Sequence, residues 1–232
     1  GNVPAYVEKS CVLKRAVNDI ILSKSFDNGM ICASEQAAIV DQEIYEDFKE
    51  EMGRFKVHFA NHEEKAKLEA YMFGCVAYSE EVNGAHLNPA VVGKPVTWIA
   101  KQAGFEVPED TQIICVECEE VGPNEPLTRE KLSPVLAVLK ATSTEDGIAK
   151  SAAMVEFNGL GHSAAIHTQN HDISVQFGLK CKAIRVIENA PSTFGGIGSV
   201  YNAFIPSLTL GCGSYGHNSV SNNVSALNLL NI

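Results

Sequence analysis

One cysteine in this chain has the setting that nucleophilic chemistry needs. Cys32 lies in the stretch FDNGMICASEQ (26–36), after an Asn-Gly turn and just before a short apolar run. Such a position can place a thiol at the mouth of a sheet, where backbone N–H groups would lower its pKa and stabilise an oxyanion at its substrate. Cys32 is therefore a candidate nucleophile, although a free cysteine is also commonly a small core residue.

A histidine and a glutamate at loop-to-strand junctions are the other candidates. His162, in NGLGHSAAIH (158–167), follows two glycines that end a helical run. An exposed imidazole there could act as a base near pH 7. Glu130, in REKLSPVLA (129–137), precedes a strand-like run. Taken alone, the two patterns also fit a surface histidine and a solvated carboxylate.

Two further motifs lack the context that their chemistry requires. The run GCGSYG (211–216) matches a dinucleotide fingerprint, but only sixteen residues follow it and none is acidic. A tight glycine loop explains it better. Cys115 and Cys118 have the spacing of half a zinc site without another half, and on a strand their spacing turns the two thiols to opposite faces. We expect both to be core or near-surface cysteines, and we expect no metal.

The elements that must position these residues alternate between helices and strands. Periodicity and capping signals predict helices near 10–26, 41–52, 61–74, 95–104, 143–157 and 173–178. Ser10, Asp41 and Ser143 are the expected capping residues of three of them. Short β-branched or apolar runs predict strands near 37–40, 111–117, 135–140, 162–168 and 183–188. This alternation predicts an α/β layered sheet.

Composition excludes several classes of protein. The chain has 232 residues, is 45% hydrophobic and 20% charged, and reads as an ordinary globular protein. Its net charge of -10 argues against a nucleic acid or an anionic membrane as partner. Neither a membrane-spanning run nor a signal peptide is expected. Seven cysteines without a repeating interval favour a reducing compartment, and the cytoplasm is the predicted location.

Six stretches, taken together, resemble the coenzyme-A-acylating aldehyde dehydrogenases. In chain order they are GNVPAYVE, SKSFDNGMICASEQ, REKLSPVLA, FNGLGHSAAIHT, NAPSTFGGIG and PSLTLGCGSYGHNSVSNNV. The resemblance covers 1–232 and is closest to the acylating domain of bacterial bifunctional aldehyde–alcohol dehydrogenases. It implies the catalytic domain of a three-layer α/β fold, without most of the Rossmann-type cofactor domain. Residues 1–205 would form that catalytic domain, and 206–232 would return towards the cofactor domain and the dimer interface.

The resemblance also implies a role for each candidate. Cys32 falls on the nucleophile that forms a thiohemiacetal and then a thioester. His162 falls on a histidine that assists the coenzyme A thiol as a base, and Glu130 on the glutamate that positions the nicotinamide ribose. The implied reaction interconverts acetaldehyde, or another short-chain aldehyde, and its acyl-CoA with NAD(H) in a homo-oligomer. Most of the NAD site would lie in the family's other half, so the chain alone is expected to be inactive or weak.

One departure from the family and two alternative functions bear on this hypothesis. Phe194 stands where the family often has glutamine, in a loop near the acyl pocket, and could alter the acyl group accepted. An NAD-independent acyltransferase or thioesterase could use the same Cys32 and His162. A non-catalytic fragment that only self-associates is the other alternative.

Overall fold

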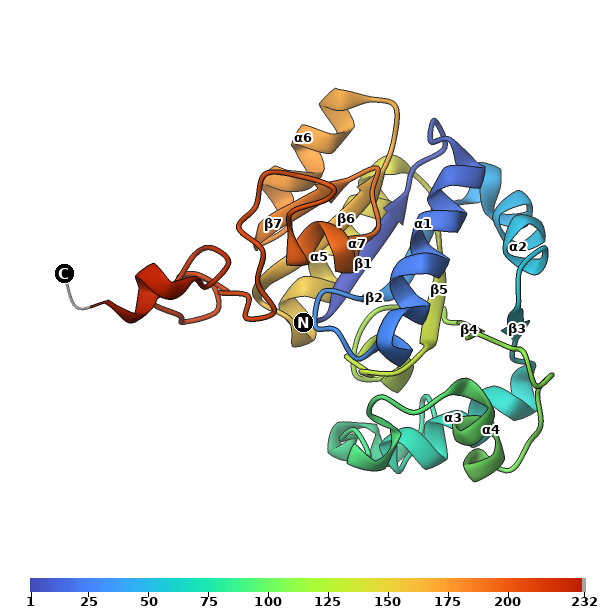
Figure 1. Ribbon diagram of the computed structural model, residues 1–232. Helices are drawn as coiled ribbons and strands as arrows, with labels where there is room; N and C mark the ends of the chain where they lie inside the picture. Colours follow the sequence, from blue (N-terminus) through green and yellow to red (C-terminus); the bar gives the residue numbers. More distant parts are fainter. Residues whose placement is uncertain (231–232) are drawn as a thin grey trace.

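The computed structural model describes residues 1–230, which form a seven-stranded parallel sheet covered by helices on both faces (Figure 1). The strand order is β3-β4-β5-β2-β1-β6-β7. The strands are β1 (Val3–Val7), β2 (Glu35–Asp41), β3 (Val57–Phe59), β4 (Ile113–Glu117), β5 (Val135–Ala141), β6 (Gly161–His167) and β7 (Ala183–Glu188). The α-helices are α1 (Leu13–Ser25), α2 (Tyr45–Gly53), α3 (His62–Phe73), α4 (Val96–Ala103), α5 (Thr144–Asn158), α6 (His171–Lys180) and α7 (Ser192–Ile197). The predicted α/β fold class is confirmed.

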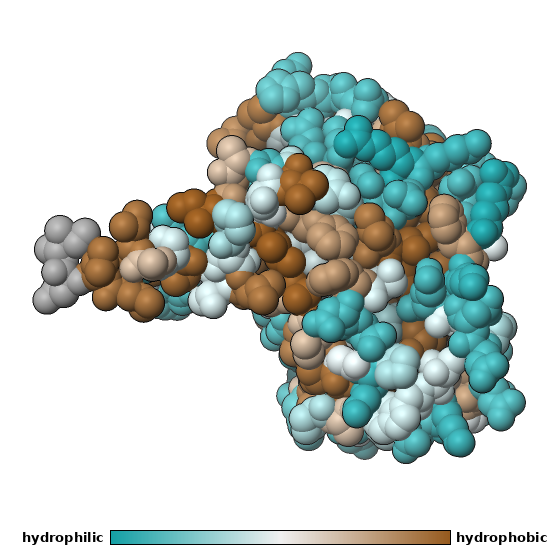
Figure 2. All heavy atoms as spheres, in the orientation of Figure 1, coloured by the Kyte–Doolittle hydropathy of each residue, from teal (hydrophilic) through white to brown (hydrophobic). Residues whose placement is uncertain are grey.

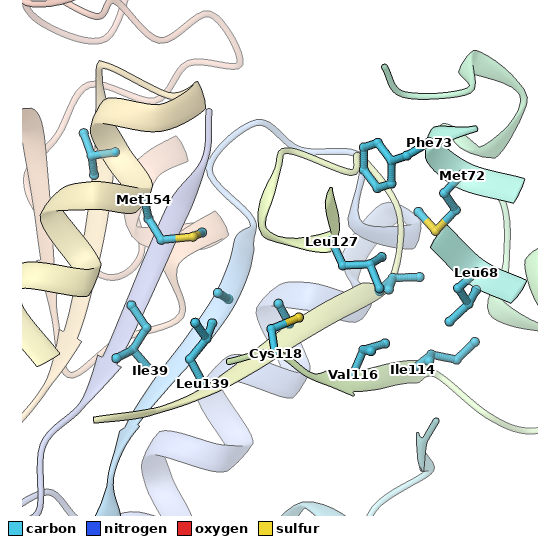
Figure 3. Packing of buried hydrophobic residues seen from close by; sticks show 14 of the residues in the cluster. Ile39, Leu68, Met72, Phe73, Ile114, Val116, Cys118, Leu127, Leu139 and Met154 are labelled. Atoms are coloured by element: carbon cyan, nitrogen blue, oxygen red, sulfur yellow. The ribbon is translucent and has the colours of Figure 1, made fainter. Parts of the chain in front are cut away.

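Side chains of the sheet alternate between two apolar layers, which explains why its strands read as continuous apolar runs. On one face, Ala38 and Val40 of β2 belong to a cluster with side chains of α1 and α2. On the other face, Ala37 and Ile39 belong to a larger cluster with side chains of α3, α4 and α5. Figure 3 shows part of this larger cluster, with Ile39 and its neighbours between the strands and the covering helices.

The predicted helices and strands are present, but two of the three predicted caps are wrong. Ser143 does accept a hydrogen bond from the backbone nitrogen of Asp146 (3.1 Å) and begins α5. Ser10 instead donates its hydroxyl to the Glu8 carboxylate. Asp41 accepts hydrogen bonds from the Tyr6 hydroxyl (2.8 Å) and the Lys9 backbone nitrogen (2.9 Å). Both side chains satisfy loops at the carboxyl ends of strands, so neither is free to cap a helix.

The inner strand β1, next to the central strand β2, is one element that sequence patterns do not predict. It is five residues long, VPAYV, and it pairs with β2 on one side and β6 on the other. A proline in a short run argues against a central strand because it cannot donate to the ladder. Here the pairing register with β2 shifts between Val3 and Pro4, so the proline lies at an irregularity. The short strand β3 and the six-residue helix α7 were likewise not predicted.

The parallel sheet gathers the candidate residues at one edge. Parallel strands share the edge at which they begin, so the segments before β1, β2, β5 and β6 meet there. Cys32 precedes β2, Glu130 precedes β5, and His162 is the second residue of β6. This amino-terminal edge is therefore the place to look for a shared site.

The C-terminal segment extends from the sheet as an arm (Figure 1). Apolar side chains gather along this arm in Figure 2. Its large exposed apolar residues include Tyr215, Leu227, Leu229 and Leu230. The division into a catalytic domain (1–205) and a C-terminal segment (206–232) stays a prediction, and residues 231–232 of that segment lie outside the described part. Within residues 1–230, none of the helices combines the length and apolarity that a membrane crossing requires.

Candidate active site

A turn with left-handed backbone conformations precedes Cys32 and places it at the amino-terminal edge of the sheet. Asp27, Asn28 and Gly29 all have positive φ, at 49°, 50° and 68°. The Asn28 side chain donates to the Gly93 carbonyl (3.1 Å), which holds the turn against the 89–93 loop. A Cβ on Gly29 would lie 2.5 Å from the Ser133 carbonyl oxygen. The Cys32 turn and the loop that follows Glu130 are therefore in backbone contact, and only glycine fits between them.

Burial, rather than local N–H groups, sets the protonation of the Cys32 thiol. The residue is half-buried, and its neighbour Ala33 packs closely against Gly196 of α7. Burial raises the pKa of Cys32, the Glu130 carboxylate raises it further, and the Arg185 guanidinium opposes the shift. The Cys32 backbone N–H does lower this pKa, as expected, but desolvation outweighs it, so the net shift is upward rather than downward. The resting thiol is protonated at neutral pH.

His162 is buried, so the expectation of an exposed imidazole is also wrong. It is only 6% exposed, because β6 continues through it into the sheet and neighbouring segments cover the strand start. Its Nδ1 lies 2.9 Å from the Ser163 hydroxyl oxygen. Burial, with the nearby Arg185 cation adding to it, lowers the pKa of His162 to about 3. The imidazole is therefore neutral at physiological pH.

Glu130 completes a cluster with Cys32 and His162 around Gly1. The Glu130 carboxylate, a quarter of whose side chain is exposed, accepts a hydrogen bond from the Gly1 nitrogen. The backbone nitrogen of Glu130 donates to the Asn158 side-chain oxygen (3.1 Å). A Cβ on Gly1 would lie 2.6 Å from the His162 ring and 2.8 Å from the Cys32 carbonyl oxygen. The structure thus brings all three sequence-predicted residues together at the amino-terminal edge of the sheet.

Arg185 is the residue at this site that sequence reasoning missed. It lies on β7, is 3% exposed, and donates to the His162 carbonyl (2.8 Å) and the Ser163 hydroxyl (3.1 Å). It also donates to the Asn223 side-chain oxygen (2.9 Å). Asn223 in turn donates to the Gly196 carbonyl (2.9 Å), so this pair ties the C-terminal segment to α7 and β6. The available signal was an arginine inside the buried run AIRVIE, since a buried charge needs partners.

The remaining motifs behave as structural features. GCGSYG (211–216) forms a loop whose backbone packs against the start of β6, and within residues 1–230 no α-helix follows it. Cys115 and Cys118 are free thiols buried in the two different apolar layers, as their spacing predicts. Phe194 packs edge-on against Phe26, with ring centroids 4.9 Å apart, which places an aromatic pair beside the Cys32 turn.

Comparisons with known proteins agree with these observations. No protein-family model matches the chain. It is 66% identical over 232 residues to the aldehyde-alcohol dehydrogenase of Streptococcus pneumoniae serotype 4, and 62% identical to aldehyde-alcohol dehydrogenase 2 of Entamoeba histolytica. These matches cover 100% of this chain but 26% and 27% of the two relatives, so the chain spans about a quarter of their length.

A solved structure gives the same result for the fold. The crystal structure of an acetylating aldehyde dehydrogenase from Geobacillus thermoglucosidasius superposes with a TM-score of 0.90 at 39% identity. The match covers 99% of this chain and 48% of that structure. Both sequence and fold are thus shared along essentially the whole chain. The chain is similar in sequence and fold, along essentially its whole length, to a part of the acylating aldehyde dehydrogenases and of the aldehyde–alcohol dehydrogenases.

Proposed function

We propose that this chain carries the acyl-transfer site of an acylating aldehyde dehydrogenase that interconverts acetaldehyde and acetyl-CoA with NAD(H). The observation that carries the proposal is the meeting of Cys32, His162 and Glu130 around Gly1. These residues come from three separate segments, yet they form one cluster that offers a nucleophile, a neutral imidazole and a carboxylate. The names of the relatives support aldehydes as the substrate class.

Cys32 acts as the nucleophile on the aldehyde carbonyl. Its sulfur forms a bond to the carbonyl carbon while the C=O π pair moves onto the oxygen. The proton that burial keeps on the resting thiol passes to that oxygen, which gives a thiohemiacetal. The Arg185 cation favours the thiolate as this proton is lost. The Cys32 adduct would lose its carbon-bound hydrogen as hydride to become a thioester, and bound NAD⁺ would supply the acceptor for that hydride.

His162 serves the second half of the reaction. The coenzyme A thiol attacks the Cys32 thioester, and the neutral imidazole takes up its proton as the sulfur of Cys32 leaves. A histidine whose pKa lies near 3 is unprotonated at neutral pH but is a weak base, so we propose that it takes up the thiol proton only as the new C–S bond forms. The reverse direction transfers an acyl group from acyl-CoA to Cys32. Its hydride then comes from NADH.

The described residues fit only part of an NAD site. The Glu130 carboxylate is partly exposed beside Cys32, where it can hold ribose hydroxyls. A dinucleotide site also needs a glycine-rich turn between a strand and a helix N-terminus, which binds the pyrophosphate. Within residues 1–230, GCGSYG lies in a loop without a following α-helix and does not offer that arrangement. We therefore propose that the chain alone binds NAD weakly and that the full enzyme, a cytoplasmic homo-oligomer, supplies the rest.

Release of coenzyme A from acetyl-CoA tests the proposed function. Mixed with excess acetyl-CoA, the purified chain should release about one equivalent of coenzyme A per Cys32 and then stop, because no second acyl acceptor is present. The Cys32→Ser variant should release none. Continuous release would instead indicate a thioesterase, and rapid NADH oxidation by the chain alone would contradict the proposed division of the cofactor site.

A further inference from the structure

A buried lysine lies directly after Glu130 and is not used by the proposed reaction. Lys131 is 0% exposed, and its Nζ donates to the carbonyl oxygens of Leu127 (2.6 Å), Arg129 (2.9 Å) and Gln36 (2.9 Å). A lysine amino group has at most three donors, and three carbonyl oxygens surround this one. Burial lowers the pKa of Lys131 well below its usual range. Two acceptors belong to its own loop and the third to β2, whose preceding turn carries Cys32. The side chain of Leu127 points into the core in Figure 3, which anchors this loop.

Gln36 makes a second link between the same two segments. Its side-chain oxygen accepts from the backbone nitrogen of Lys131 (3.0 Å) and from the buried ammonium of Lys24 (3.4 Å). Its side-chain nitrogen donates to the Ser34 carbonyl (3.2 Å). The Gln36 side chain therefore connects Ser34, in the segment after Cys32, to Lys131, the residue after Glu130.

The peptide groups on both sides of Glu130 are tied by these contacts. Lys131 holds the carbonyl before Glu130, Gln36 holds the nitrogen after it, and Asn158 holds its own nitrogen. A buried charge is costly, and an apolar side chain of the same volume would fill the space more cheaply. Lys131 instead binds three backbone carbonyls in two segments. This arrangement points to a role in positioning those segments rather than in raising the free energy of unfolding.

We propose that Lys131 and Gln36 are positioning residues that hold the backbone on both sides of Glu130 and thereby place its carboxylate near Cys32. The proposal rests on the proposed function for the roles of Glu130 and Cys32. Its test, however, uses the chemistry of the thiol alone and needs neither coenzyme A nor NAD.

The charged and titratable groups that face Cys32 come from four segments. They are the Gly1 nitrogen before β1, Glu130 before β5, His162 on β6 and Arg185 on β7. Of these, only Glu130 is held by Lys131 and Gln36. It is also the one facing group that disfavours the thiolate, since its charge raises the pKa of Cys32. Releasing the Glu130 loop should therefore make Cys32 easier to deprotonate.

Alkylation of Cys32 by iodoacetamide, followed against pH and assigned by peptide mass spectrometry, tests this coupling. Glu130→Gln should speed alkylation about threefold near neutral pH by lowering the apparent pKa of the thiol. Lys131→Met should shift the profile in the same direction. The double variant should shift it no further than Glu130→Gln alone, because the two changes act through one carboxylate. Lys140→Met, which removes an exposed lysine on β5, is the matched control and should leave the profile unchanged.

Several results would overturn the proposal. An unchanged profile in Lys131→Met beside a shifted one in Glu130→Gln would show that Lys131 does not set the carboxylate's position. Additive shifts in the double variant would show that the two residues act separately. If Lys131→Met does not fold, Gln36→Leu breaks the same connection and has to give the same shift. Failure of Cys32 to accept an acetyl group would contradict the proposed function but would leave the alkylation profiles readable.

Discussion

At the scale of single residues, Cys32 and His162 rest as a neutral thiol and a neutral imidazole. Burial moves their pKa values in opposite directions, upward for the thiol and downward to about 3 for the imidazole. A thiolate–imidazolium pair would require a lowered pKa for the Cys32 thiol and a raised pKa for the His162 imidazole. Both groups are therefore uncharged at rest, and we propose that Cys32 acts as a nucleophile only as its proton is transferred.

The depressed pKa of His162 predicts acid-sensitive stability. Its pKa is about 3 in the folded chain and ordinarily near 6.5 in an unfolded one, so below pH 6.5 the unfolded state binds more protons. The stabilisation is complete above pH 6.5 and is lost as the pH falls towards 3. Between pH 6.5 and 5 the free energy of unfolding should fall by about 2 kcal/mol from this residue alone.

Urea unfolding at the two pH values measures this effect. His162→Gln should lose less stability than the wild type on going to pH 5, whereas His86→Gln, at an exposed position, should follow the wild type. An equal loss in His162→Gln and the wild type would mean that His162 is protonated in the folded state at pH 5.

The sequence was sufficient to predict the candidate residues but not their environment. The Asn28-Gly29 pair before Cys32 marks an exposed turn, and turn chemistry is local. Burial of the thiol depends on α7, which lies about 160 positions later in the chain, and on Arg185. Contacts between such distant segments leave no periodic pattern. For this reason the sequence did not predict the net rise in the pKa of Cys32 or the burial of His162.

At the scale of elements, two loops that touch through their backbones carry the site. Gly29, in the Cys32 turn, packs on Ser133, in the loop after Glu130. The hydrogen bonds of Lys131 and Gln36 join the same two loops. The segments that carry Cys32 and Glu130 are therefore held together by loop-to-loop contact, and the strands β2 and β5 form their rigid base.

Gly29→Ala should disrupt this contact. The new Cβ would meet the Ser133 carbonyl at 2.5 Å and would force a non-glycine residue to keep a φ of 68°. We expect a loss of about 2 kcal/mol or more in the free energy of unfolding, together with slower acylation of Cys32. Gly53→Ala, at the end of α2 where nothing lies within 4 Å, is the control and should be neutral or slightly stabilising. Urea titration measures both, and an unchanged stability in Gly29→Ala would refute the close contact.

Helices and strands whose apolar residues repeat at a regular spacing could be predicted from the sequence. Elements that depend on pairing with segments distant in the sequence could not. Helices such as α1 and α5 repeat their apolar residues at helical spacing, and β4 and β5 are rich in β-branched residues. The inner strand β1 contains a proline and is recognisable only from its pairing on both sides. The incorrect cap at Asp41 shares that cause, because its partners Tyr6 and Lys9 are distant in the sequence. Ser10 differs, since its hydroxyl donates to the nearby Glu8.

At the scale of the whole molecule, the parallel sheet converts three distant stretches of sequence into one site. Every strand begins at the same edge, so Cys32, Glu130 and His162 need only precede or begin their strands to meet. The exposed apolar residues of the arm, such as Leu227 and Leu229, are consistent with a surface that other parts of an assembly cover.

The rate of acetyl transfer from acetyl-CoA to each cysteine tests the central claim most directly. Peptide mass spectrometry over a time course gives these rates for the wild type, His162→Ala and a control, His86→Ala. We predict that Cys32 is acetylated faster than the other six cysteines, and that His162→Ala, but not His86→Ala, slows it about tenfold or more. If Cys32 stays free, or reacts no faster than Cys11 or Cys75, the three residues do not form a working site in this chain.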